Sequence, residues 1–288
     1  MNKKNLLPFF IFCFITVELF AQDSDFALSD PLQPGKVMYP SFIGAEIAMG
    51  QSLQQGDLRA EFCDCLPFKD GRGLRFDIGG KWESYISNRL AYGFGFGFSY
   101  TTNSAAYQEV SDYQFIDNGN VIATVPVRTQ QTMNTSFSAI TFSPFIKIYP
   151  LKRLWFRIVP RIEYVVGSTQ EQTLDLLQRK AVNRDGNEFE LSFDPSDPKL
   201  ADKKVTTTRA TIQNSEFASL RALQLGLVPS IGFDFRIGNK VVVSPNVQLN
   251  IPLTSYSTQS ESFKILAWQF GLDVKFRLGK SVIAPAKK

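Results

Sequence analysis

The residues best suited to catalysis or ion pairing are charged side chains that recur at every second position of otherwise apolar segments. The set comprises Arg75, Asp77, Lys81, Glu83, Lys147, Arg157, Arg161, Glu163, Asp234, Asp273, Lys275 and Arg277, with Glu46 as a further acid. General acid–base catalysis could use the carboxylate pair Asp77 with Glu83, or the carboxylate of Glu163 beside Arg161. The mixture of signs equally suits a network of ion pairs that neutralise one another, and we favour that structural interpretation.

Other catalytic chemistry finds little support. Histidine is absent from the whole chain, which excludes every triad or dyad that relies on imidazole. A Ser-Lys or two-carboxylate site stays open. Gly93, Gly95 and Gly97 do not form a dinucleotide motif, because that motif requires a following helix. Residues 183–188 faintly resemble a calcium loop, but the regular ligand spacing is missing and we favour a turn. We expect no cofactor.

Two cysteines, Cys63 and Cys65, lie outside the N-terminal apolar segment. Disulfides persist in the oxidising compartments that exported proteins reach. One intervening residue would close a tight, strained ring, and no histidine or further cysteine outside the N-terminal apolar segment could complete a soft metal site. We therefore expect either a local disulfide or two idle thiols.

The clearest local pattern is the stretch Leu90–Tyr100, which alternates large apolar residues with Gly, Ala and Ser. Successive side chains of a β-strand point to opposite faces. The stretch thus predicts a strand with one large apolar face and one face of very small side chains, which we call the bare face. Similar alternation occurs in segments 41–50, 74–83, 135–149, 156–166, 223–234, 241–251 and 266–278. This makes about eight strands, each near or above the roughly 9–11 residues that a tilted strand needs to cross a bilayer.

A soluble β-sandwich would bury these apolar faces, whereas a membrane barrel would turn them to lipid. The bare face of Leu90–Tyr100 favours the barrel, since tiny side chains suit a crowded lumen better than a wet surface. We expect the apolar residues to face lipid, among them Phe94, Phe96, Phe98, Phe270 and Phe276. Aromatic residues near strand ends predict two interfacial girdles from Trp82, Tyr85, Tyr100, Tyr149, Trp155 and Trp268. Bulges or bends are expected at Pro144, Pro160, Pro229 and Pro245.

The links between the predicted strands alternate in length. Short links lie at 87–88, 150–153 and 238–239, whereas links 51–72, 101–134 and 167–218 are long and polar. Outer-membrane barrels place short turns in the periplasm and long loops outside. An Asn-Gly pair at 118–119, between two apolar runs, predicts a hairpin that continues the sheet above the membrane. Asp185-Gly186 gives a weaker hairpin cue.

The N-terminus has the features of an export signal. Lys3 and Lys4 precede the apolar stretch 6–20, and Ala21 offers a small residue for cleavage. We divide the chain into a signal peptide (1–21), a periplasmic segment (22–40), the barrel (41–278) and a periplasmic basic tail (279–288). Without the signal peptide the net charge is +3, too mild and scattered for nucleic-acid binding.

The segment Phe142-Ser143-Pro144-Phe145-Ile146-Lys147-Ile148-Tyr149-Pro150, followed by Leu154-Trp155-Phe156, resembles a strand-and-turn motif of the small porin-like, PorT-type outer-membrane barrels of Bacteroidota. Phe20-Ala21-Gln22 and the closing run 269–278 are similar too. Lys147 and Ile148 stand where that family often has Arg and Tyr. The resemblance implies an eight-stranded barrel and no single activity, because its members include uncharacterised barrels and accessory parts of secretion machines.

The combined expectation is a transmembrane, antiparallel, up-and-down β-barrel of the Gram-negative outer membrane. Its role is expected to be structural or surface-binding through the long loops, and non-enzymatic. A narrow pore, or an accessory part of a secretion machine, is the alternative. Expected partners are outer-membrane lipid, the barrel-assembly machinery and an envelope or secretion complex, with no nucleic acid. Phe276 is a candidate assembly signal, because many barrels end at an aromatic residue.

Overall fold

The computed structural model describes residues 28–30, 33–38, 40–59, 66–117, 120–182, 186–193, 204–217, 219–258 and 262–278. The proposed signal peptide, the two cysteines, the hairpin cue at 118–119 and the basic tail lie outside the described residues. So do residues 183–185, which are half of the segment 183–188 compared above with a calcium loop.

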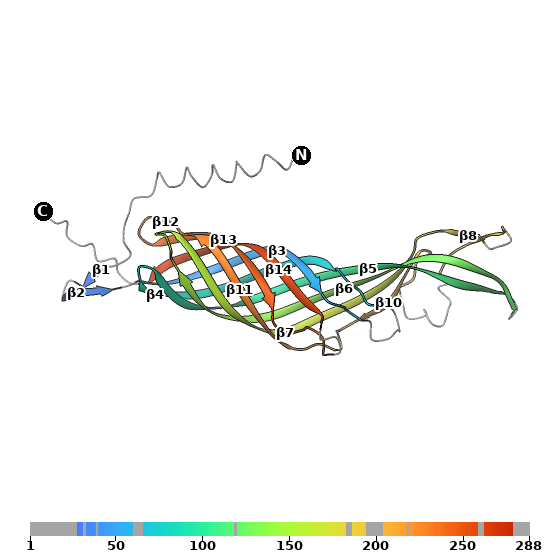
Figure 1. The fold of residues 1–288 in the computed structure, drawn as a ribbon, viewed down its shortest axis with the longest axis horizontal. Coiled ribbons are helices and arrows are strands. Elements are labelled where there is room, and N and C mark those ends of the chain that lie inside the picture. The colour runs from blue at the N-terminus through green and yellow to red at the C-terminus, as the bar shows by residue number, and fades with distance from the viewer. Residues whose placement is uncertain are drawn as a thin grey trace, which may run out of the picture.

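Eight long strands form one antiparallel barrel (Figure 1). They are β3 (Ser41–Gln55), β4 (Arg72–Ser87), β5 (Leu90–Asp117), β6 (Asn120–Ile148), β7 (Leu154–Leu176), β11 (Leu223–Phe233), β13 (Val241–Pro252) and β14 (Lys264–Leu278). Each pairs with its neighbours along the chain, and β14 pairs back onto β3 from Lys264↔Gln55 to Leu278↔Ser41. The ring is therefore closed, and the predicted eight-stranded up-and-down barrel is confirmed.

Six shorter strands complete the described structure. They are β1 (Leu28–Asp30), β2 (Gln33–Met38), β8 (Lys180–Val182), β9 (Glu188–Glu190), β10 (Arg209–Ser215) and β12 (Phe235–Ile237). β1 and β2 form a hairpin, as do β8 and β9. β12 continues the line of β11 by pairing with β13, and β10 adds to the long end of β7.

Side chains alternate between the two faces of the barrel wall, with charged or small groups inside. Along β7, for example, the buried residues Arg157, Val159, Arg161 and Glu163 alternate with the exposed residues Phe156, Ile158, Ile162 and Tyr164. A wide apolar outer surface over a polar interior is the distribution that a barrel needs to sit in lipid. The described residues contain no helix long and apolar enough to cross a membrane.

The apolar outer band ends sharply on the long-loop side. On β5 the last outward apolar side chain of the band is Tyr100, and the next outward positions are Thr102 and Ser104. On β6 the outward Ser136 and Ser138 lie beyond Ile140. The apolar part of the outer face of β5 is therefore Leu90–Tyr100, a length that matches the roughly 9–11 residues of a tilted membrane crossing.

The four prolines lie within regular strands, so the expected bulges are not found there. Pro160 and Pro229 keep register with Leu227 and Ile158, and Pro245 pairs with Leu272. The β6–β7 ladder has no recorded partners between Phe142↔Ile162 and Ile146↔Ile158, where register places Pro144 opposite Pro160. Proline lacks the N–H that a ladder uses. Two facing prolines thus interrupt the hydrogen bonding without shifting the register.

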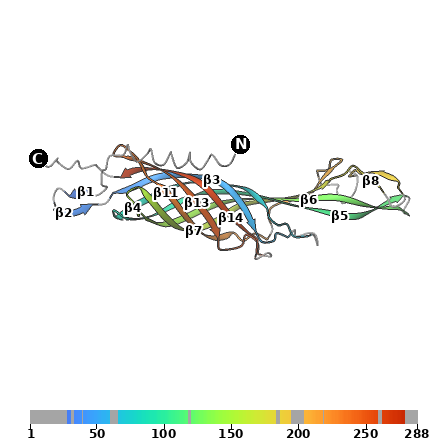
Figure 2. The same cartoon turned by 45° about the horizontal axis from the view of Figure 1, so that its top comes forward.

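The two ends of the barrel differ. Short turns join β4 to β5, β6 to β7 and β12 to β13 at one end, where β3 begins and β14 ends. At the other end β5, β6 and β7 run on beyond the apolar outer band. β5 first stays paired with β4, as far as Arg72↔Ser104, and the strands then extend past the barrel, where β10 joins β7 (Figures 1 and 2). We call this extension the protruding sheet: residues 101–117, 120–137, 168–176 and β10. The link expected at 101–134 is thus strand throughout its described residues, and the link expected at 167–218 is strand in part.

Candidate functional site

Six basic and six acidic side chains fill the lumen as three groups of four, each with two positive and two negative charges. We name them by their place along the barrel axis. The lower tetrad, near the short turns, is Glu83, Lys147, Asp234 and Lys275. The middle tetrad is Glu46, Lys81, Arg157 and Asp273, and the upper tetrad is Arg75, Asp77, Arg161 and Glu163.

In the lower tetrad both lysines contact both carboxylates. Lys275 Nζ lies 3.1 Å from Glu83 Oε1 and 3.3 Å from Asp234 Oδ2. Lys147 Nζ lies 3.2 Å from Glu83 Oε2 and 3.9 Å from Asp234 Oδ1. The hydroxyls of Tyr149 and Ser244 donate to Asp234 at 3.0 and 2.6 Å. The carboxylates are thus shared and satisfied, as buried charges require.

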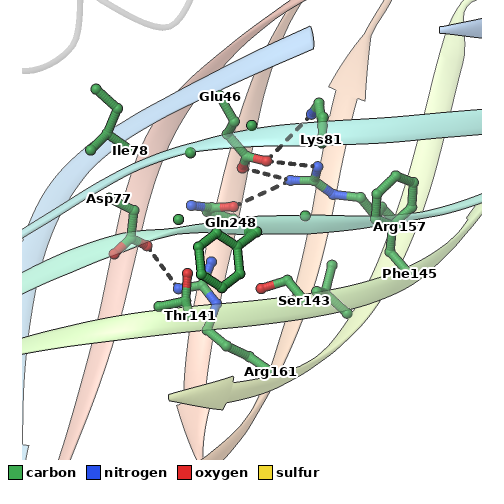
Figure 3. Close-up of a pocket in the computed structure, with 16 residues that line it drawn as sticks. Glu46, Asp77, Ile78, Lys81, Thr141, Ser143, Phe145, Arg157, Arg161 and Gln248 are labelled. Atoms are coloured by element: carbon green, nitrogen blue, oxygen red, sulfur yellow. Dashed lines mark hydrogen bonds and ion pairs between the residues drawn. The ribbon is translucent and has the colours of Figure 1, made fainter. Parts of the chain in front are cut away.

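The middle tetrad is built around a fork between an arginine and a carboxylate (Figure 3). Arg157 donates to both oxygens of Glu46, at 3.1 and 3.0 Å, and Lys81 Nζ lies 3.3 Å from the same carboxylate. Asp273 forms ion pairs with Lys81 and, at 3.6 Å, with Arg157. Two-point contacts of this kind fix geometry as well as charge.

The upper tetrad connects the lumen to a loop at the long-loop end. Arg75 pairs with Asp77 at 3.1 Å and with Glu163, while Arg161 Nη1 lies 2.7 Å from Asp77 Oδ2. Tyr256, between β13 and β14, donates its hydroxyl to Glu163 at 3.3 Å. Burial raises the pKa of the Tyr256 hydroxyl above its usual range, so the donor keeps its proton.

The structure separates one predicted pair and leaves one predicted residue outside the tetrads. Asp77 and Glu83 belong to different tetrads, so the two-carboxylate arrangement considered from the sequence is not formed. Glu163 does lie 3.7 Å from Arg161. Arg277 has no ion pair among the described residues. The tyrosines that donate to the tetrads, Tyr149 and Tyr256, were not identified from the sequence as lumen residues.

A small cavity lies between the middle and upper tetrads (Figure 3). Its volume is about 40 Å³, room for very little beyond water. Arg157 and Arg161 line it from β7, and Gly79, Gly95 and Gly97 line it from β4 and β5. The small residues thus leave space beside the charged groups, as their position on the bare face of the strand suggests.

An aromatic plug closes the lumen at the short-turn end. Phe42, Tyr85, Tyr149 and Trp155 are buried together there, with the Tyr85 and Tyr149 hydroxyls 2.6 Å apart. Lys147 Nζ lies 4.1 Å from the centre of the Trp155 ring, a cation–π contact. The prediction that Tyr85, Tyr149 and Trp155 belong to an interfacial girdle is therefore wrong. Each occupies an inward position of its strand.

An apolar cap closes the opposite end. It comprises Leu58, Phe68, Ala105, Met133, Phe137, Ala139, Val165, Phe217, Tyr256, Phe263 and Ile265. The rings of Phe137 and Tyr256 lie 4.7 Å apart, and those of Phe217 and Phe263 lie 6.1 Å apart. Links between strands supply Leu58, Phe68, Phe217, Tyr256 and Phe263, so the connecting segments fold inward over the lumen.

The outer wall carries the residues expected to face lipid. Phe94, Phe96, Phe98, Phe270 and Phe276 are each between 40 and 62 % exposed. Trp82, Tyr100 and Trp268 share the outward face of their strands, and Trp82 packs against Tyr92 and Phe94. No group of three or more potential metal ligands occurs among the described residues.

Comparisons with known proteins give distant structural likenesses only. No family model matches the chain, and no curated protein matches it. Neisserial surface protein A is 13% identical with a TM-score of 0.33, over 82% of this chain and 97% of that one. Ail, the attachment invasion locus protein of Yersinia pestis, is 8% identical with a TM-score of 0.28, over 83% and 99%. The outer membrane protease OmpT from Escherichia coli is 7% identical with a TM-score of 0.27, over 83% and 96%.

Proposed function

We propose that the chain is a non-enzymatic outer-membrane protein whose barrel holds the protruding sheet outside the cell, where the sheet binds a partner. One observation carries this proposal: the lumen is filled, while strands β5 and β6 continue far beyond the membrane band. Thr101–Asp117 is strand along its whole described length, on the order of 50 Å at about 3.3 Å per residue.

The filled lumen argues against transport. Three neutral tetrads lie in series between an aromatic plug and an apolar cap. A pore would need these groups to move together, and removing one partner of a buried ion pair is costly. The same pairing argues against catalysis, since the lumen carboxylates are held between cations instead of facing an open cleft.

The outer membrane is the proposed location, reached through the signal peptide at 1–21. In such barrels short turns face the periplasm and long connections face outward. The termini of the barrel lie at its short-turn end, so the protruding sheet would be extracellular. Cell fractionation tests this: the full chain should stay with the outer membrane, and release with periplasmic extract would contradict it.

A truncation tests the binding role. Gln108 and Gln130 are register partners on β5 and β6, so residues 109–129 can be replaced by an Asn-Gly turn. Proteoliposomes carrying the full chain or this variant would be compared on arrays of polypeptides and polysaccharides. We expect ligands that bind the full chain and not the variant. Identical binding profiles would overturn the proposal.

A further inference from the structure

One edge of the protruding sheet lacks a neighbour among the described residues. β4 ends its pairing with β5 at Arg72↔Ser104. Phe68 belongs to the link between β3 and β4, and its ring lies 5.0 Å from the ring of Tyr107. This link therefore lies beside β5 as far as Tyr107. From Gln108 to Gln114, β5 pairs with β6 on one side and with no described residue on the other. We call this side of residues 108–114 the β5 edge.

The other margins of the sheet are covered. Beyond the end of β7, Leu177 donates its N–H to the Arg128 carbonyl at 3.0 Å, and Gln178 bonds to the Pro126 carbonyl at 3.1 Å. Val125 and Val127 are buried with Ala181 and Leu191. β10 is partly covered, since Thr211 donates to the Lys204 carbonyl at 3.0 Å. The β5 edge is the long uncovered margin of the described sheet.

The β5 edge carries acidic side chains but neither lysine nor proline. Natural edge strands use charged side chains, especially lysine, together with proline or bulges to prevent another strand from adding. Residues 108–114 read Gln-Glu-Val-Ser-Asp-Tyr-Gln, with neither lysine nor proline, and the register shift of this hairpin comes later, between Phe115 and Ile116. Val110 is 63% exposed, so an added strand would also cover apolar surface.

The negative charge of the β5 edge indicates which kind of strand could pair with it. Glu109 and Asp112 are acidic, and no base occurs between Gln108 and Asp117. Glu109 accepts a hydrogen bond from Gln131 at 3.4 Å, and Asp112 is exposed with no ion pair among the described residues. A second copy of this chain would bring two edges of net negative charge together, and like charges repel across paired strands. A basic strand would place opposite charges together.

We propose that the β5 edge binds an extended, basic polypeptide by β-strand addition, with basic residues three positions apart. Main-chain hydrogen bonds would supply affinity, and side chains would set specificity. Glu109 and Asp112 are three residues apart and so lie on opposite faces of the strand. An antiparallel partner meets both only if its basic residues have the same spacing. This inference rests on the proposed binding role and names its ligand class.

The test uses the full chain in nanodiscs and a fluorescent peptide, Thr-Val-Lys-Thr-Val-Lys-Thr-Thr, followed by anisotropy. We expect binding by this peptide and weakening of about tenfold or more when alternate backbone nitrogens on its pairing edge are methylated, because methylation removes main-chain hydrogen bonds. A peptide with lysines two apart should bind more weakly. The double variant Glu109→Lys/Asp112→Lys should prefer the same peptide with glutamates. The matched control Glu190→Lys, on β9, which pairs with β8, should behave as the native chain.

Each contrary result has a definite meaning. Equal binding of the methylated peptide would overturn strand addition and leave only charge attraction. Hydrogen exchange that shows the amides of 108–114 already protected in the free protein would overturn it as well, since the edge would be covered. If no peptide binds but the truncation of 109–129 still abolishes binding of another ligand, strand addition is wrong and the proposed binding role stands.

Discussion

Each buried charge in the lumen depends on its tetrad. A single ion in a low-dielectric interior is costly, and a pair repays that cost only when geometry and further hydrogen bonds are good. In the lower tetrad Asp234 receives contacts from two lysines, Tyr149 and Ser244. Individual residues of a tetrad should therefore be far more sensitive to substitution than charged residues that lie beside it.

Asp234→Asn tests this sensitivity. The change leaves Lys147 and Lys275 with a single carboxylate, Glu83, and should lower the free energy of unfolding by about 3–5 kcal/mol. Urea unfolding in lipid vesicles would measure it. Arg277→Gln is the matched control, because Arg277 has no described ion pair, and should change stability by about 0.5 kcal/mol or less. Equal effects of the two changes would contradict the tetrad.

Two glycines of the bare strand face should respond differently to alanine. A Cβ on Gly93 would lie 2.6 Å from Phe145 Cζ and also against the Trp82 carbonyl, whereas a Cβ on Gly95 would find its nearest neighbour, the Gly80 carbonyl, at 3.5 Å. Gly93→Ala should cost about 1–3 kcal/mol through overpacking. Gly95→Ala should be nearly neutral, and the same unfolding measurement would reveal a reversed order.

At the scale of the strands, alternation was enough to predict the barrel. The regular change from apolar to polar residues predicted eight strands and most of their faces, because lipid and lumen impose opposite demands on the two sides of one wall. The prediction of an interfacial girdle was wrong for Tyr85, Tyr149 and Trp155, because it was based on residue type and not on alternation. Trp155 adjoins the outward Phe156, so alternation already places it inside.

The protruding sheet could be predicted only in part. The Asn-Gly pair indicated a hairpin at 118–119, yet residues 101–112 and 126–136 are mostly polar and lack the regular alternation of apolar residues. Their strands persist because each pairs with a neighbour over a long register. The partners within each tetrad were equally hidden, since they depend on which strands meet across the lumen.

The barrel should fold without the outer part of β5 and β6. Replacing residues 109–129 by Asn-Gly keeps the register partners Gln108 and Gln130 and all three tetrads. We expect the variant to retain heat-modifiable mobility on gels, with a melting temperature close to that of the native chain. A variant that fails to assemble would mean that the protruding sheet is needed to form the barrel.

At the scale of the whole molecule, the lumen is closed at several levels along the barrel axis. The apolar cap, the three tetrads and the aromatic plug each obstruct the lumen, so removing one should not create a channel. The double variant Phe217→Ser/Phe263→Ser opens the cap alone. We expect neither it nor the native chain to conduct in planar bilayers, with an open porin as positive control. Stable channels in the native chain would contradict the proposed role.

For the proposed outer-membrane location, the distribution of the tetrads along the chain also bears on how the strands enter the membrane. β4 contributes to all three tetrads through Arg75, Asp77, Lys81 and Glu83, while Asp273 and Lys275 arrive only with the final strand. A nascent sheet that lacks β14 would bring uncompensated charge into contact with acyl chains. Insertion should therefore be cooperative, with strands held together outside the hydrocarbon until the last one docks and every charge is neutralised at once.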